Sequence, residues 1–180
     1  MTEEELENLR YPIGHFHHPG TISDLHVLDW IAELEALPVK LADRVTPLTE
    51  AQLDTPYRPG GWTVRQVVHH LADSHHNSYI RFKWGLTEDT PRIKAYDEKA
   101  WADLHDSRQA PIGLSLDHLR AVHAKLVFLL RGLESHHLRR GFEHPETGAV
   151  TSLQENIGRY AWHGNHHLAH IDHLIERMGW

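Results

Sequence analysis

The chain has 180 residues, of which 40% are hydrophobic and 24% charged, so it is long enough and apolar enough to bury a core of its own. This composition excludes intrinsically disordered and fibrous proteins, and the length predicts one domain over residues 1–180. Acidic side chains outnumber basic ones by 25 to 18, which gives a formal net charge of −7. Because binding to nucleic-acid phosphates needs a basic face, we expect no nucleic-acid partner.

The sequence also limits the cellular setting. No apolar stretch reaches the about 18–20 residues of a membrane span, and the acidic N-terminal residues are unlike a signal or transit peptide. The absence of cysteine excludes disulfides, thiolate metal sites and cysteine nucleophiles. We therefore expect a cytoplasmic enzyme or binding protein with no membrane partner.

The first predicted elements are an arm and a long helix. Residues 1–20 have turn-forming prolines and glycines without a sustained period, which predicts an extended arm over the body. A helix follows from Ser23, where leucine, isoleucine and valine recur every three or four residues. Pro38 is expected to kink this helix and Pro47 to end it, and residues 49–53 predict a short helical turn.

A second long helix and a long connection follow. Thr63-Val-Arg-Gln66 has the pattern of a capping box, which predicts a helix that starts there and runs to about Trp84. The connection over residues 86–114 is expected to contain a short helix over residues 97–104. Because that connection is long for a helical bundle, it has a function of its own or crosses the bundle.

The last third of the chain predicts two more long helices. One opens at Ser115, and residues 141–150 then read as a long turn or a small hairpin. Ser152-Leu-Gln-Glu155 is a second capping box, which opens a final helix that ends near Met178. Four long amphipathic helices predict an all-α fold, an up-down four-helix bundle with an N-terminal arm and a long crossover connection.

Histidine is unusually abundant, with 19 copies against 18 lysines and arginines together. Histidine is the commonest side-chain metal ligand, and histidines four apart on a helix lie one turn apart on one face. The last helix offers two such pairs, His163 with His167 and His166 with His170. The first pair lies at the edge of the apolar stripe and the second lies further round the helix, which favours the first. Gly164 removes bulk beside it, which would suit a cavity.

Two histidines make a weak site, and this spacing also arises by chance on a solvated helix face. A third ligand should therefore come from the second helix, which offers His69 and His70 on opposite sides of its apolar stripe. Geometry alone does not choose between them. His75 points to the middle of that stripe, where a hydrogen-bonded core histidine is the alternative to a ligand.

Several segments resemble a known family. Residues 62–73 read Trp-Thr-Val-Arg-Gln-Val-Val-His-His-Leu-Ala-Asp, and residues 162–170 read Trp-His-Gly-Asn-His-His-Leu-Ala-His. Shorter motifs occur at residues 11–14, 52–58, 79–83, 96–101 and 177–180. Together they resemble the DinB/YfiT-like superfamily of four-helix-bundle metalloproteins, and in particular its YfiT branch, over nearly the whole chain.

The resemblance implies a metal site. In that family a divalent ion is held by one histidine in a His-Leu-Ala context and by two histidines four apart on the last helix. The matching positions are His70, His163 and His167, for one ion per chain, zinc or nickel. His69 stays in reserve, because two histidines precede Leu-Ala here. Three nitrogen ligands with an open fourth position are typical of a catalytic site, and relatives imply a homodimer.

The resemblance also implies an enzyme, with more than one reaction open. Relatives of the YfiT branch are similar to bacillithiol S-transferases, in which a metal-bound thiolate attacks an electrophilic substrate. A metal-dependent hydrolase using a metal-bound water is the alternative. A non-catalytic metal-binding stress protein is the remaining interpretation. No general base stands out in the sequence, so the catalytic residue is unassigned.

A bacillithiol-like thiol carries carboxylates and a sugar, so its pocket should offer cations and hydrogen-bond donors. The candidate substrate-binding residues are Tyr57, Arg58 and Arg81. Further candidates are Arg65, Asn77 and Tyr79. A surface ion pair is the alternative role for each arginine. Asp73 either orients a ligand imidazole or lies on a solvated face of its helix.

Overall fold

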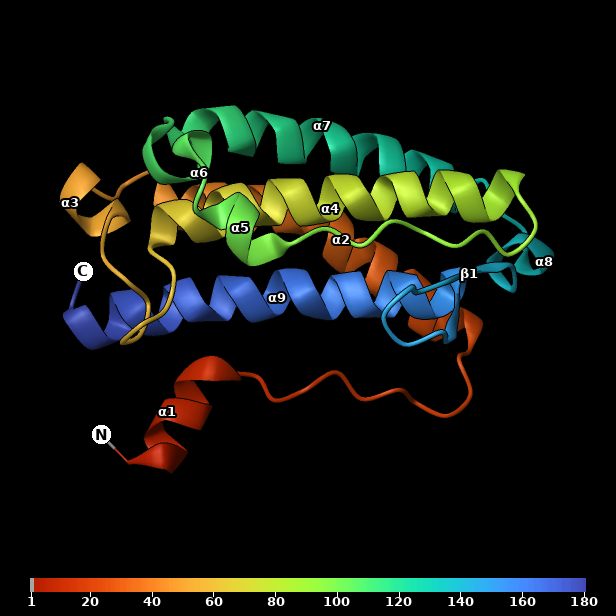
Figure 1. Ribbon diagram of the computed structural model, residues 1–180, viewed down its shortest axis with the longest axis horizontal. Helices are drawn as coiled ribbons and strands as arrows, with labels where there is room; N and C mark the ends of the chain where they lie inside the picture. The colour runs from red at the N-terminus through yellow and green to blue at the C-terminus, as the bar shows by residue number, and fades with distance from the viewer. Residues whose placement is uncertain (1) are drawn as a thin grey trace.

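The computed structural model describes residues 2–180, so Met1 of the expected arm lies outside it (Figure 1). Its long helices are α2 (Asp24–Val45), α4 (Val64–Thr87), α7 (Ile112–Arg131) and α9 (Leu153–Met178). The short helices are α1 (Glu3–Arg10), α3 (Glu50–Leu53), α5 (Glu98–Ala102), α6 (His105–Gln109) and α8 (Ser135–Leu138). An antiparallel hairpin joins β1 (Gly141–Glu143) to β2 (Val150–Ser152). The expected all-α four-helix bundle is confirmed.

Local capping starts three of the four long helices. The N-cap residues of α2, α4 and α9 are Ser23, Thr63 and Ser152. The side chain of each accepts a hydrogen bond from the backbone N–H three residues later, which has no partner within the helix itself. Thr63 and Gln66 form the expected reciprocal box. At Ser152 the hydrogen bond from the Glu155 N–H forms, but the Glu155 carboxylate accepts from Arg159.

The start of α7 differs from the expected position, whereas the end of α2 agrees with it. The predicted start of the third helix at Ser115 is wrong by one turn, because α7 begins directly after Pro111, which takes the N-cap place. The Ser115 hydroxyl contacts His69 instead of capping a helix. Pro38 lies inside α2, and that helix ends at Val45, two residues before Pro47 as expected.

The arm is only partly extended, and the prediction for residues 1–20 is wrong where α1 forms. Thr2 and Glu5 close a capping box, and the glutamates of the first turn interact favourably with the helix dipole. After α1 the chain runs extended alongside α9 (Figure 1). There the Trp162 indole donates to the carbonyl oxygen of Gly14 at 3.2 Å, which holds the arm against the bundle.

The long helices do not follow the up-down order that the sequence predicts. Helices α4 and α7 run in the same direction, since His69 of α4 contacts Ser115 of α7, and further along His76 contacts His118. Helices α2 and α9 also run in one direction, opposite to that of the other two (Figure 1). Each long helix packs mainly against two others, so α2 and α4 lie diagonally across the bundle.

This arrangement explains the long connection after α4. Because α4 and α7 are parallel neighbours, the chain has to return along the bundle before α7 begins. Residues 88–111 make this return and carry α5 and α6 (Figure 1). On the way, the Ile93 N–H donates to the carbonyl of Glu143 in β1 at 3.1 Å. The connection therefore crosses the bundle, which was one of the two expected alternatives.

The core has two apolar clusters with a layer of histidines between them. One cluster, near the hairpin, includes Phe82, Leu126 and Phe142, and the other, near α3, includes Leu41 and Leu71. Along α4, α7 and α9, the residues of the two clusters are separated by histidines: His75, His123, His163 and His167. This polar layer is where the bundle can do chemistry. Within residues 2–180, no helix is long and apolar enough to cross a membrane.

Gly164 brings α9 close to α2 and does not make room for a cavity. A Cβ atom at this position would lie 2.3 Å from Cδ2 of Leu37, a buried side chain of α2. The interpretation of Gly164 as cavity-forming is therefore wrong. The glycine allows close helix packing next to the histidine layer.

Candidate metal centre

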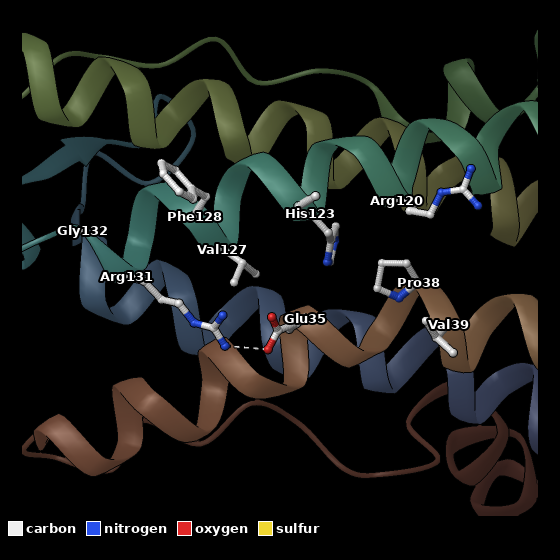
Figure 2. A pocket seen from close by; sticks show the side chains of 10 residues that line it. Glu35, Pro38, Val39, Arg120, His123, Val127, Phe128, Arg131 and Gly132 are labelled. Atoms are coloured by element: carbon white, nitrogen blue, oxygen red, sulfur yellow. Dashed lines mark hydrogen bonds and ion pairs between the residues drawn. The ribbon is translucent and has the colours of Figure 1, made fainter.

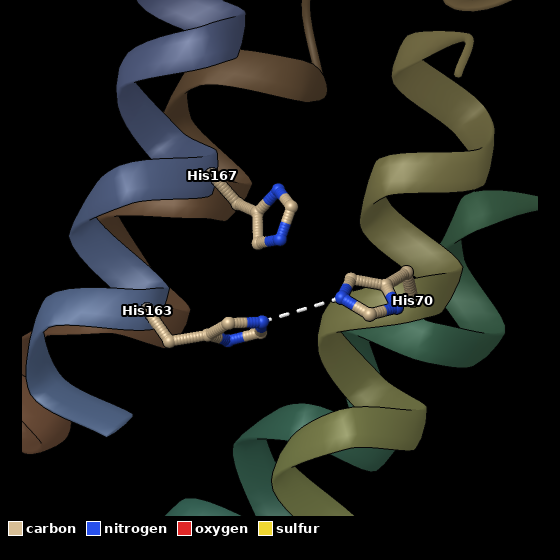
Figure 3. A group of neighbouring side chains, drawn as sticks. All are labelled: His70, His163 and His167. Atoms are coloured by element: carbon tan, nitrogen blue, oxygen red, sulfur yellow. Dashed lines mark hydrogen bonds between the residues drawn. The ribbon is translucent and has the colours of Figure 1, made fainter. Parts of the chain in front are cut away.

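Three histidines come together where α4 faces α9: His70, His163 and His167 (Figure 3). One ring nitrogen of each lies within 4.8 Å of those of the other two, and the Nε2 atoms of His70 and His163 are 3.3 Å apart. With zinc–nitrogen bonds of about 2.0–2.1 Å, two ligands of a tetrahedral ion lie about 3.3 Å apart. The three imidazoles therefore fit a divalent ion.

All three rings are in the protonation state that binds metal. Burial lowers the pKa of His70 to about 4. Burial first, and neighbouring histidines second, lower the pKa values of His163 and His167 well below the usual range. Because the rings are neutral near pH 7, each has a lone pair available for an ion.

The structure distinguishes His69 from His70, the two adjacent candidates for the third ligand. His69 uses both ring nitrogens elsewhere: Nδ1 lies 2.7 Å from the Ser115 hydroxyl and Nε2 lies 3.1 Å from the carbonyl oxygen of Ala110. His70 instead faces α9, and its ring contacts Trp62 at 4.7 Å between centroids. The structure thus brings His70 to the cluster and directs His69 towards α7.

The second histidine pair of α9 is covered by the N-terminal arm. The His170 Nε2 atom lies 3.0 Å from the carbonyl oxygen of Arg10, and its ring stacks on Tyr57 at 4.0 Å. His166 stacks on Trp162 at 4.6 Å. Both histidines are buried, because the arm occupies the side of α9 that the helical pattern alone leaves open.

A pocket of 380 Å³ opens beside the three histidines, with walls from α4, α9, the crossover and the hairpin turn. Arg81 lines it, is 9% exposed and donates from Nη1 to the Tyr160 hydroxyl at 3.2 Å. The Arg81 Nε and the His144 Nδ1 are buried and have no partner within residues 2–180. Buried polar atoms are normally paired, so these two indicate a polar ligand in the pocket.

Of the three candidate substrate-binding residues, only Arg81 lines this pocket. Tyr57 and Arg58 line a neighbouring pocket, which shares Trp62 and Glu98 with the first. The Arg58 Nε donates to the Tyr57 hydroxyl at 3.2 Å. Only a ligand that extends past Trp62 could reach both groups of residues.

The further candidate Arg65 has a structural role. Its guanidinium is 4% exposed, pairs with the carboxylates of Glu50 and Asp54, and donates to the carbonyl of Ala110 at 3.1 Å. The ion-pair alternative is therefore correct for this residue, which ties α3 and the crossover to the start of α4.

The polar candidates further along α4 also lie away from the cluster. The Asn77 amide donates to the backbone carbonyl of Asp73 at 2.9 Å, and the Tyr79 ring lies under the ammonium groups of Lys83 and Lys125. Burial, and then the neighbouring Asp106, raises the pKa of Asp73 to about 6. Within residues 2–180 no hydrogen bond joins the Asp73 carboxylate to His69, His70, His163 or His167, so the structure does not support a role of Asp73 in orienting a ligand.

The sequence reasoning missed His123 of α7. This residue is 1% exposed, and its Nε2 lies 2.8 Å from Nδ1 of His75. A signal was available, because His123 lies four residues after the core residue Leu119, at a spacing that directs it inward. His75 is indeed a hydrogen-bonded core histidine.

An apolar groove lies on another side of the bundle, between α2 and α7 (Figure 2). Its walls include Val39 and Phe128, and an ion pair of 2.6 Å between Glu35 and Arg131 spans it. Phe128 is 85% exposed. The groove is separate from the pocket beside the three histidines. The expected homodimer stays a prediction.

Comparisons with known proteins agree with this architecture. Residues 33–171 match the family model described as the DinB superfamily. The Bacillus subtilis protein named "Putative metal-dependent hydrolase YfiT" is 53% identical over 173 residues, which cover 96% of this chain and 97% of that protein. An Oceanobacillus iheyensis protein, also named as a "Putative metal-dependent hydrolase", is 52% identical over 173 residues, with coverages of 96% and 99%.

A solved structure shows the same fold. Bacillus subtilis YfiT, described with that structure as "a probable metal-dependent hydrolase with an unusual four-helix bundle topology", matches with a TM-score of 0.94 and 53% identity. The match covers 96% of this chain and 99% of that one. The parallel neighbours α4 and α7 are consistent with a bundle topology described as unusual. This chain therefore belongs to the DinB superfamily.

Proposed function

We propose that the protein is a metal-dependent enzyme that transfers a small thiol onto an electrophilic substrate. The observation that carries the proposal is the meeting of three neutral imidazoles at the wall of a pocket. The names of the relatives support a metal-dependent enzyme. Three histidine ligands would leave coordination positions free for a substrate, and all three histidines line the pocket.

His70, His163 and His167 would hold one zinc or nickel ion per chain. When bound, the ion supplies positive charge that keeps a thiol sulfur deprotonated near pH 7. A free thiol with a pKa of about 8.5 is only a few per cent ionised at that pH. The histidines would thus raise the concentration of the reactive form of the thiol at the pocket.

All the atoms that change bonds in this reaction come from the thiol and the electrophile. The thiol loses its proton to solvent, its sulfur forms a bond to a carbon of the electrophile, and the leaving group departs with its bonding electron pair. The chain has no cysteine, so the sulfur belongs to the thiol substrate. The protein binds both partners, holds them in line and keeps the sulfur ionised.

The pocket favours a thiol that carries an anionic group. The guanidinium of Arg81 is buried, and hydrogen bonds between a buried guanidinium and a carboxylate are among the strong ones. His144 would add a second donor from the hairpin turn. If the thiol is long enough to pass Trp62, Tyr57 and Arg58 would hold its far end.

The alternative is a hydrolase, which the names of the relatives favour. It would use the same three histidines, with an ionised water in place of the thiol. The two reactions differ in one requirement, because a hydrolase needs no thiol. A non-catalytic metal-binding protein would turn over neither kind of substrate.

Cobalt-substituted protein separates these functions. We expect titration with bacillithiol to produce a sulfur-to-cobalt charge-transfer band and the same thiol to be needed for consumption of a model electrophile. Because thiol binding releases a proton, affinity should rise with pH up to about 8.5, where the free thiol itself ionises. Hydrolysis of an ester or amide without thiol, and without the band, would favour the hydrolase. The variant His69→Ala serves as a control that keeps all three ligands.

A further inference from the structure

A chain of hydrogen bonds runs from the ligand His163 across the bundle. The His163 Nδ1 lies 3.2 Å from Nε2 of His75, and the His75 Nδ1 lies 2.8 Å from Nε2 of His123. The His123 Nδ1 contacts the backbone carbonyl oxygen of Leu34, and Figure 2 shows His123 reaching from α7 towards α2. This chain therefore links α9, α4, α7 and α2.

The carbonyl at its end fixes the direction of every bond in this chain. A carbonyl oxygen only accepts hydrogen bonds, so the His123 Nδ1 carries the hydrogen. A neutral imidazole has one N–H and one lone pair, so the His123 Nε2 accepts from His75 Nδ1. By the same rule the His75 Nε2 accepts from His163 Nδ1. The lone pair of His163 is then on Nε2, which is the atom that faces His70.

Burial keeps the rings of this chain neutral. His75 and His123 are 0% and 1% exposed, and no carboxylate within residues 2–180 hydrogen-bonds to either. An extra proton on a ring that is buried without a counterion is costly. The tautomer of His163 is thus set by a backbone carbonyl three hydrogen bonds away.

His167 has a shorter chain of the same kind. The His170 Nε2 lies 3.0 Å from the carbonyl oxygen of Arg10, so this nitrogen carries the hydrogen. The lone pair on the His170 Nδ1 faces the His167 Nδ1 at 3.3 Å. His167 therefore donates from Nδ1 and keeps its lone pair on Nε2. Because Arg10 ends α1, the N-terminal arm takes part in this arrangement.

We propose that His75, His123 and His170 are positioning residues for the metal centre. They hold His163 and His167 in the Nδ1–H tautomer, so that both present Nε2 to the ion. A hydrogen-bond acceptor at the far nitrogen also fixes the ring orientation and raises the basicity of the ligand. The inference rests on the proposed metal site and is independent of which reaction the site catalyses.

The unmodified, zinc-loaded protein provides the first test. Long-range ¹H–¹⁵N spectra distinguish ring nitrogens that carry a hydrogen from those that bind a metal or hold a lone pair. We expect hydrogen on Nδ1 and zinc on Nε2 for His163 and His167, and hydrogen on Nε2 for His170. Zinc on Nδ1 of either ligand would overturn the proposal.

The second test measures zinc affinity by competition with a chromophoric chelator. His123→Phe and His170→Phe should each raise the dissociation constant by about 10–100-fold while one ion per chain still binds at saturation. His123→Gln should recover part of the affinity, because its amide can accept from His75 and donate to Leu34. This rescue separates a hydrogen-bonding role from a packing role.

Matched controls exist on α4 and α9. His76→Phe breaks a surface hydrogen bond of 2.8 Å to His118 that leads to no ligand, and His173→Phe changes an exposed residue one turn from His170. Neither should change zinc affinity. Folded His123→Phe and His170→Phe variants with unchanged affinity would contradict the proposal, whereas a wild-type protein that binds no zinc would contradict the proposed function itself.

Discussion

Helix α4 carries histidines on two sides, and the two sides lead to different structures. On the side of α9, His70 and His75 both contact His163, and His75 also links His163 to His123 of α7. Towards α7, His69 and His76 meet a hydroxyl, a carbonyl and a surface histidine. The comparison shows that abundance of histidine does not locate a metal site. What locates it is whether the facing helix leaves lone pairs available at one point.

The largest expected effect comes from removing one of the three proposed metal ligands. His70→Ala, His163→Ala or His167→Ala leaves two imidazoles, so tight binding of one divalent ion per chain should be lost. Metal analysis after dialysis against a weak chelator measures this loss. His69→Ala should retain the ion, and the opposite result for His69 and His70 would reverse the comparison.

Acid should unfold the metal-free protein. Burial lowers histidine pKa values on both sides of α4, to about 4 for His70, so below about pH 6.5 the unfolded chain binds more protons than the folded one. The contribution of these histidines to the free energy of unfolding is therefore fully present above their pKa in the unfolded chain. It is lost as the pH falls towards their lower pKa in the folded protein. Each such histidine contributes roughly 1.4 kcal/mol per pH unit in that window.

The stability lost through several such histidines together is comparable to the whole free energy of unfolding of a typical domain, about 5–15 kcal/mol. Circular dichroism should thus show an unfolding midpoint near pH 5, roughly midway in the window between the two pKa values. Saturating zinc should move the midpoint to lower pH, because an ion that binds only the folded state stabilises it. A signal that stays constant from about pH 7 to 4 would contradict neutral burial of the histidines.

An intermediate effect is expected on the α7 side. His69→Ala removes the contacts to Ser115 and Ala110, and the free energy of unfolding in urea should fall by about 1–3 kcal/mol. Zinc affinity should be unchanged. Ser115→Ala, which removes only one of the two contacts, should cost less. A loss of affinity that parallels the loss of stability would mean that the two sides of α4 are coupled.

The smallest effect is expected at the surface. His76→Ala removes an exposed hydrogen bond to His118, and the free energy of unfolding should change by less than about 0.5 kcal/mol. Thermal melting of both variants, His76→Ala and His69→Ala, in one buffer makes the comparison direct. Equal losses in the two variants would contradict the distinction between buried and exposed partners.

The fold was predictable where it depends on local interactions. The capping residues Thr63 and Ser152 and the helical periods locate the starts of α4 and α9, because these features act within a few residues. The direction of α7 was not predictable in this way. It depends on the path of residues 88–111 across the bundle, and no short pattern encodes such a path.

The site was predictable to a similar degree. The pair His163 and His167 follows from helical spacing, because both residues lie on one helix. The choice between His69 and His70 depends on which neighbour lies on each side of α4. His123 depends on the same placement, since its partners lie on α4 and α2. Such contacts between helices become visible only when the helices are placed.

The parallel arrangement of α4 and α7 has a consequence for biosynthesis. In this arrangement α2 packs against α7 and α9. The first long helix to leave the ribosome therefore has no packing partner until these later helices have been translated. Likewise His70 emerges 93 residues before His163. The proposed metal site can therefore form only after α9 has been translated, so metal binding there would be a late event for each molecule. Nitrogen sites accept several divalent ions, so the metal available to the cell at that moment would decide which ion is taken up.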